Sequence, residues 1–158
     1  MKRVFLFMTL AALLCSAQAP KKFTTRKMSD EFVGAWKLIS FERRTAAGEV
    51  TYPMGQNPVG RITYDALGRM SAQLMRPDRP HFQNSAGSAE EKVAAFDGYV
   101  AYYGTYTVNP ANHTVVHHVE ASLNPNWAGI DLTRSYEFSN SQLILSTAEL
   151  RLVWERAR

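Results

Sequence analysis

Apolar and polar residues alternate with a period of two along most of the chain from residue 33 onward. Successive side chains of a β-strand point to opposite faces, so this period predicts strands that each have one buried face. Clusters of Gly, Pro, Asn and Asp separate the runs, as expected of turns. The number and spacing of the runs predict an all-β antiparallel fold, either a barrel or a sandwich. We expect strands at 36–41, 49–52, 61–64, 69–75, 99–109, 114–122, 132–139, 142–147 and 150–154.

One short helix interrupts this pattern in the middle of the chain. Residues 76–88 are rich in Pro, Asn, Ser and Gly, and their length suits a functional loop. Ser88 and Glu91 then have the spacing of a capping box, which predicts a helix beginning there and running to about Phe96. Its apolar side would be Val93, Ala94 and Phe96.

The two ends of the patterned region favour a barrel over a sandwich. Trp36 lies just inside the first strand, and Arg156 lies just past the last. A guanidinium stacks well on an indole face, so the pair would meet if the sheet curls until its first and last strands join. We therefore predict an antiparallel up-and-down barrel over residues 33–156, with Trp36 and Arg156 in structural roles.

The first nineteen residues have the features of a secretory signal peptide. Lys2 and Arg3 precede an apolar run at 4–14, and small residues follow at Ala17 and Ala19, either of which could precede the cleavage site. This predicts a secreted or periplasmic protein with no stable membrane span once the signal is cleaved. An uncleaved anchor is the alternative. Residues 20–32 are polar and lack periodicity, so we expect a flexible lead-in.

Cysteine content and charge narrow the possible chemistry. Cys15 is the single cysteine, so a product cleaved after it has no disulfide and no thiol nucleophile. Lipidation of Cys15 is disfavoured because Leu14 precedes it, where a small residue is required. The formal net charge is +4. The basic residues do not form a face interleaved with aromatics, so no nucleic-acid partner is expected.

The predicted inward face is mostly apolar and aromatic, and Arg134 is its exception. Alternation places Arg134 on the same face as Leu132, Tyr136 and Phe138. A buried cation is costly unless it is paired. Arg134 would therefore face a carboxylate such as Glu120 or Glu42, lie at a wet rim, or bind the anionic group of a ligand.

The positions of the histidines argue against an interior metal site. The chain has four, at 81, 113, 117 and 118. His117 and His118 are adjacent on a predicted strand and would point to opposite faces, so they cannot share an interior metal ion. We expect no metal and no cofactor. His117 shares a face with Val115 and Val119, which places it inside near Tyr102 and Tyr106.

Several ordered motifs resemble the lipocalin-like domain proteins of the calycin superfamily, found in bacteria and fungi. The resemblance covers about residues 33–156. Lipocalins also have a disulfide and a C-terminal helix after the barrel, which this chain lacks in its sequence. The motifs are Gly34–Glu42, Tyr52-Pro53-Met54-Gly55, Pro58-Val59-Gly60, Gly68–Arg76, Tyr102-Tyr103-Gly104-Thr105-Tyr106, Val116–Glu120, Asn124-Pro125-Asn126-Trp127 and Trp154-Glu155-Arg156.

The resemblance implies a calyx-like barrel that binds small apolar molecules. Our leading hypothesis is an exported binder of a small, mostly apolar molecule that could carry an anionic group, with no catalytic residue. One alternative is an isomerase or cyclase that uses His117 or Glu120 as acid or base. Another is a protein-interaction module that uses the 76–88 loop and the helix. The oligomeric state is left open. The predicted ligand-binding residues are Tyr102, Tyr106, His117, Arg134 and Trp127.

Overall fold

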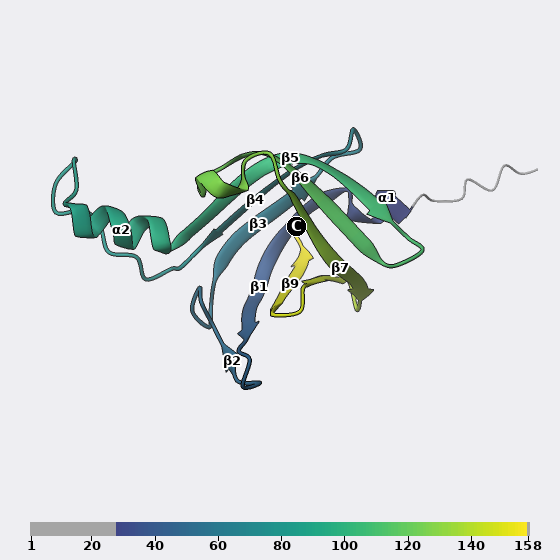
Figure 1. Ribbon diagram of the computed structural model, residues 1–158, viewed down its shortest axis with the longest axis horizontal. Coiled ribbons are helices and arrows are strands. Elements are labelled where there is room, and N and C mark those ends of the chain that lie inside the picture. The colour runs from purple at the N-terminus through teal and green to yellow at the C-terminus, as the bar shows by residue number, and fades with distance from the viewer. Residues whose placement is uncertain (1–27, 158) are drawn as a thin grey trace, which may run out of the picture.

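The computed structural model describes residues 28–157, and it is dominated by strands (Figure 1). The predicted signal peptide and most of the predicted lead-in lie outside the described residues. The elements are α1 (Met28–Phe32), β1 (Gly34–Arg44), β2 (Val50–Thr51), β3 (Val59–Tyr64), β4 (Arg69–Met75), α2 (Ala89–Asp97), β5 (Tyr99–Asn109), β6 (Thr114–Ser122), the 3-10 turn η1 (Pro125–Trp127), β7 (Asp131–Ser139), β8 (Gln142–Ser146) and β9 (Leu150–Arg156).

The strands form a closed antiparallel barrel. From β3 to β9 each strand pairs with the next one along the chain. Strand β1 pairs with β3 on one side and with β9 on the other, so β1 and β3–β9 close into a ring. The short β2 adds only to the far end of β1. This confirms the predicted all-β, up-and-down, lipocalin-like barrel with a helix inserted in mid-chain.

The barrel closes at Trp36 and Arg156, as predicted. The Arg156 guanidinium carbon lies 4.2 Å from the centroid of the Trp36 ring. The same guanidinium donates hydrogen bonds to the carbonyl oxygens of Val33 and Glu31, both at 2.6 Å. Gly34 has a φ of +133°, and a Cβ there would lie 2.5 Å from Nη1 of Arg156. A glycine is therefore required at position 34, both by the backbone conformation and by the close approach of Arg156.

The expected flexible lead-in is wrong for its last five residues. Met28–Phe32 forms α1, and Phe32 has no exposed surface. Its ring meets those of Tyr64, Tyr136 and Phe138 edge-on, with centroids 5.0–5.2 Å apart. The Trp36 indole N–H also donates to the carbonyl oxygen of Phe32 at 2.8 Å. The helix forms because Phe32 plugs this end of the barrel, which we call the closed end.

A β-bulge in β1 corrects one predicted face. Strict alternation places Ser40 inside with Trp36 and Leu38, and Phe41 outside. The pairing of β1 with β9 instead shifts register between Leu38 and Ser40. The extra residue, Ile39, changes the phase of the strand. Phe41 is consequently buried, while Ser40 is only half-buried.

Helix α2 extends away from the barrel (Figure 1). Its capping box is present as predicted, with the Ser88 hydroxyl accepting from the Glu91 N–H and the Glu91 carboxylate accepting from the Ser88 N–H. Its apolar side is not buried, since Val93 is 60% and Phe96 is 46% exposed. Within residues 28–157, no helix is long and apolar enough to cross a membrane.

Candidate functional site

A cavity lies inside the barrel, in the half away from α1. The 76–98 segment, the 123–130 loop and the β8–β9 connection lie at the barrel end opposite α1. We call the half of the barrel next to them the open half. The cavity has a volume of about 60 Å³. Its lining is mostly aliphatic and aromatic: Phe41, Ile62, Leu74, Val100, Tyr102, Trp127, Arg134, Leu145, Leu150, Leu152 and Trp154.

The cavity is smaller than the ligand-sized space expected from the sequence. Ligand pockets usually span roughly 300–1,000 Å³, so this cavity is several times too small for a typical ligand. Large rings account for the difference, because Trp36, Trp154 and Tyr64 are all almost fully buried in the core. A ligand larger than this space therefore needs a lining side chain to move.

Trp127 is the lining residue with the least backbone restraint. Among the residues of 28–157 that line the cavity, it alone comes from a connection rather than a strand. It lies on η1, where Asn124 caps the turn by accepting from the Asn126 N–H at 3.0 Å. Its ring packs edge-on against Tyr102, with centroids 5.9 Å apart. Trp127 is therefore the lining side chain that no strand pairing holds in place.

His117 lies beneath the cavity in a buried hydrogen-bonded cluster. It has no exposed surface, in agreement with its predicted inward face. Nε2 lies 2.8 Å from the Tyr64 hydroxyl, and Nδ1 lies 3.0 Å from the Tyr102 hydroxyl. The three side chains come from β3, β5 and β6. Both ring nitrogens therefore have partners, and the imidazole does not line the cavity.

The electrostatics of this cluster favour a neutral imidazole. Burial, with smaller effects from the charges of Arg134 and His118, lowers the pKa of His117 to about 3. Burial also raises the pKa of Tyr102 to about 12, although Arg134 acts to lower it. The pKa of Tyr64 is raised well above its ordinary value, again mainly by burial. All three groups are therefore uncharged near neutral pH.

Arg134 has neither of the carboxylate partners considered from the sequence. It is half-buried and lines the cavity, and Nη1 donates to the carbonyl oxygen of Thr133 at 3.1 Å. Glu42 lies instead near Arg151, with 3.9 Å between Oε2 and Nη1, and Glu120 is exposed. Among residues 28–157, no carboxylate lies within ion-pair distance of Arg134. No salt bridge within the described part of the chain therefore neutralises the positive charge at the cavity.

The predicted ligand residues separate into two groups. Tyr102, Trp127 and Arg134 line the cavity, and His117 supports Tyr102 from below. Tyr106 lies toward the closed end, where its hydroxyl donates to the carbonyl oxygen of Asp65 at 3.0 Å. It is not among the cavity-lining residues, so its position indicates a structural role.

The outward histidine is separate from this cluster. His118 Nδ1 lies 2.7 Å from the Asp131 carboxylate, and its Nε2 lies 3.0 Å from the Thr107 hydroxyl. The two adjacent histidines therefore point to opposite faces. In the part of the chain that the structure describes, no group of three or more His, Cys, Asp or Glu side chains could hold a metal ion.

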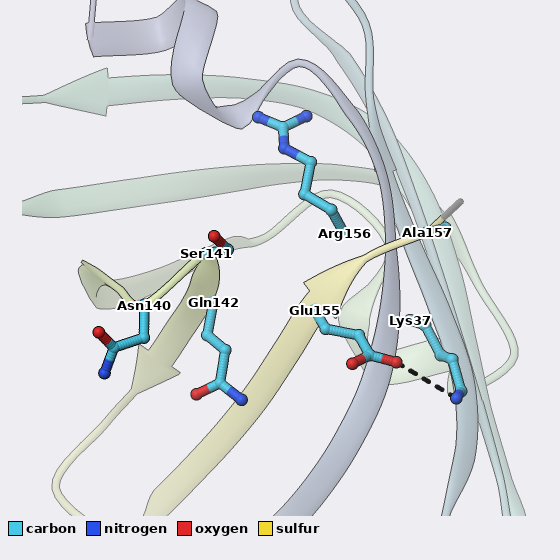
Figure 2. Close-up of a pocket in the computed structure, with 7 residues that line it drawn as sticks. All are labelled: Lys37, Asn140, Ser141, Gln142, Glu155, Arg156 and Ala157. Carbon is cyan, nitrogen blue, oxygen red and sulfur yellow. Dashed lines mark hydrogen bonds and ion pairs between the residues drawn. The ribbon is translucent and has the colours of Figure 1, made fainter.

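Two larger hollows lie on the outer surface of the barrel. One is polar, about 640 Å³, and lies beside the β7–β8 turn (Figure 2). Its side chains do not converge, since Arg156 points toward α1 and Glu155 pairs with Lys37 at 3.3 Å. The other is apolar, about 440 Å³, and opens where β1 and β3 stop pairing, beside Val59 and Met75.

The family of the chain follows from its sequence together with this fold. A family model described as a lipocalin-like domain matches residues 33–157, which is most of the chain. The chain belongs to this lipocalin-like domain family. A curated relative is the 4'-hydroxy-3'-methoxypropiophenone carrier protein of Aspergillus oryzae. It is 39% identical over 87 residues, a match that covers 49% of this chain and 78% of the relative.

Sequence reasoning missed two polar groups of this lipocalin-like barrel. Tyr64 was not assigned to the interior, although it shares a face with the apolar Ile62 two residues earlier. Trp154 was expected on the inward face, without attention to its indole N–H. Its indole N–H is buried and has no hydrogen-bond acceptor among the described residues. Alternation places Trp154 inside and could have placed Tyr64 there, but it does not show which of their polar atoms lack a partner.

Proposed function

We propose that this lipocalin-like protein binds a small, mostly apolar molecule in the open half of its barrel and acts as a carrier for it. The observation that carries the proposal is an interior apolar cavity with a half-buried arginine, which no carboxylate of the described residues neutralises. The carrier relative supports a small-molecule role, and its printed name supplies an aromatic ketone as a first probe. The arginine favours ligands that present an oxygen or an anionic group.

The acid–base alternative has less support from the positions of its residues. A general acid or base must reach the reacting group through a hydrogen bond or a single water. His117 has both nitrogens engaged and lies beneath the lining, and Glu120 is exposed on the outside of the barrel. Binding without catalysis is therefore the function that this geometry supports best.

Blocking the cavity tests the proposal. We expect calorimetry to detect binding of 4'-hydroxy-3'-methoxypropiophenone to the wild-type protein, with affinity falling at least tenfold in Val100→Trp. Val100 is half-buried and lines the cavity, so an indole there occupies the space that the ligand needs. Val93→Trp is the matched control, since Val93 is 60% exposed on α2. Equal affinity in Val100→Trp and wild type would place the ligand elsewhere.

Export of the protein is a further part of the proposal. It rests on the charged, apolar and small-residue regions of residues 1–19. We expect the intact mass of the protein recovered from its natural source to correspond to loss of residues 1–17 or 1–19. A mass that includes the whole sequence would contradict cleavage and favour the uncleaved anchor.

A further inference from the structure

The hydrogen bonds of His117 have a direction that the surrounding packing determines. A neutral imidazole carries one N–H donor and one bare nitrogen acceptor. One of its two tyrosine partners must therefore donate a hydrogen bond to the ring, and the other must accept one. Tyr64 and Tyr102 have no other hydroxyl partner among the described residues. Whichever tyrosine accepts from His117 keeps its own hydroxyl hydrogen without a protein acceptor.

Tyr64 is the tyrosine that must donate. It is 2% exposed, and its ring is enclosed by Phe32 and Tyr106, with centroids 5.2 and 4.8 Å away. An unused hydroxyl hydrogen there would be buried without an acceptor, which is costly. Tyr64 therefore donates to Nε2 of His117, and Nδ1–H donates to Tyr102. The oxygen–nitrogen distances of 2.8 and 3.0 Å fit an O–H donor and an N–H donor respectively.

Tyr102, which lines the cavity, is then left with a hydroxyl hydrogen that has no acceptor among the described residues. Two further donors occur in the same lining. The Trp154 indole N–H is buried without an acceptor among the described residues, and the Arg134 guanidinium has no ion pair with a carboxylate within residues 28–157. The remaining lining side chains are hydrocarbon except for Trp127, whose indole N–H is also a donor. Apart from the Tyr102 oxygen, which accepts from His117 in this arrangement, the polar side-chain atoms of the described lining are hydrogen-bond donors.

We propose that the cavity binds its ligand through an acceptor oxygen, a carbonyl or an oxyanion, held by Tyr102, Trp154 and Arg134, and that His117 positions Tyr102 as a donor. This inference rests on the proposed binding function and names the chemical class of its ligand. An apolar molecule with such an oxygen satisfies donors that are otherwise unpaired. A molecule with a C–H group in place of that oxygen leaves these donors unsatisfied, which weakens binding.

The tautomer of His117 tests the positioning step without any ligand. We expect nitrogen-15 NMR of the ligand-free protein at neutral pH to show Nδ1 protonated and Nε2 bare, with the resonances assigned by their loss in His117→Gln. The opposite tautomer would make Tyr102 donate to His117 and free the Tyr64 hydrogen instead. That result would overturn the proposal that Tyr102 offers its hydroxyl hydrogen to the ligand.

A matched pair of compounds tests the ligand class. We compare 4'-hydroxy-3'-methoxypropiophenone with 2-methoxy-4-propylphenol, in which a methylene replaces the carbonyl. We expect wild-type protein to bind the ketone about tenfold more tightly, the factor typical of one well-placed hydrogen bond. Tyr102→Phe and Trp154→Phe should each reduce that preference several-fold. The ratio of the two affinities is the readout because general damage to the fold affects both compounds alike.

The outward Tyr103 provides the control for these variants. It is 55% exposed, so Tyr103→Phe should keep the wild-type preference. Equal binding of both compounds to the wild-type protein would overturn the inference about the acceptor oxygen and leave the proposed binding function in place. Binding of neither compound would contradict the proposed function, and the ligand class would fall with it.

Discussion

Phe32→Ala is expected to lower the free energy of unfolding by about 3–5 kcal/mol, the range seen when a fully buried phenylalanine is truncated. Phe32 has no exposed surface and contacts three aromatic rings at the closed end. Truncation would leave a void that strands β3 and β7 cannot collapse into without losing their pairing. Urea denaturation followed by circular dichroism measures the change.

Phe82→Ala is the matched control for this experiment. Phe82 lies in the 76–88 loop and is 42% exposed, so its loss should change stability by less than about 0.5 kcal/mol. A loss below about 1 kcal/mol for Phe32→Ala would mean that α1 does not plug the barrel. Residue 32 lies just outside the matched family region, so the result also decides where the folded domain begins.

Acid is expected to destabilise the protein through His117. Its pKa is lowered to about 3 in the fold, mainly by burial, against an ordinary value of 6.5. As the pH falls, the unfolded chain takes up a proton near pH 6.5 while the folded chain does not. This contribution is therefore complete above pH 6.5 and is lost as the pH falls toward 3. Over that range it is on the order of 5 kcal/mol, of which about 2 kcal/mol is lost by pH 5.

The window between pH 6.5 and 5 isolates this effect. The carboxyl pKa values of Asp65, Glu90 and Glu91 are also lowered, by hydrogen bonds that they accept, so they contribute at more acidic pH. Urea midpoints at several pH values should fall steeply in this window for wild type and His118→Gln. They should stay flat for His117→Gln. A flat wild-type profile would contradict the buried neutral imidazole.

The barrel itself could be predicted from local patterns. Alternation located each main strand because one face of every strand meets a shared core. The Trp36–Arg156 contact was predictable because closure joins the first strand to the last, and the capping box predicted where α2 begins. These features depend on residues that are close in sequence or that lie at the two ends of the pattern.

Features that depend on packing could not be predicted in this way. The bulge at Ile39 leaves no mark on composition, yet it turns Phe41 inward. A five-residue helix such as α1 has no periodicity to detect, and only the hole at the barrel end explains it. The cavity volume depends on how side chains that are far apart in the sequence fill the barrel interior. The His117–Tyr64 hydrogen bond joins residues 53 positions apart, so the pairing needs coordinates.

The central claim is that the ligand occupies the open half of the barrel interior. Intermolecular nuclear Overhauser effects between bound 4'-hydroxy-3'-methoxypropiophenone and protein methyl groups test it most directly. We expect contacts to the inward methyl groups of Leu74, Leu145 and Leu152, which line the cavity. Contacts confined to Val59 and Met75 at the outer hollow, or to Val93 on α2, would contradict the account.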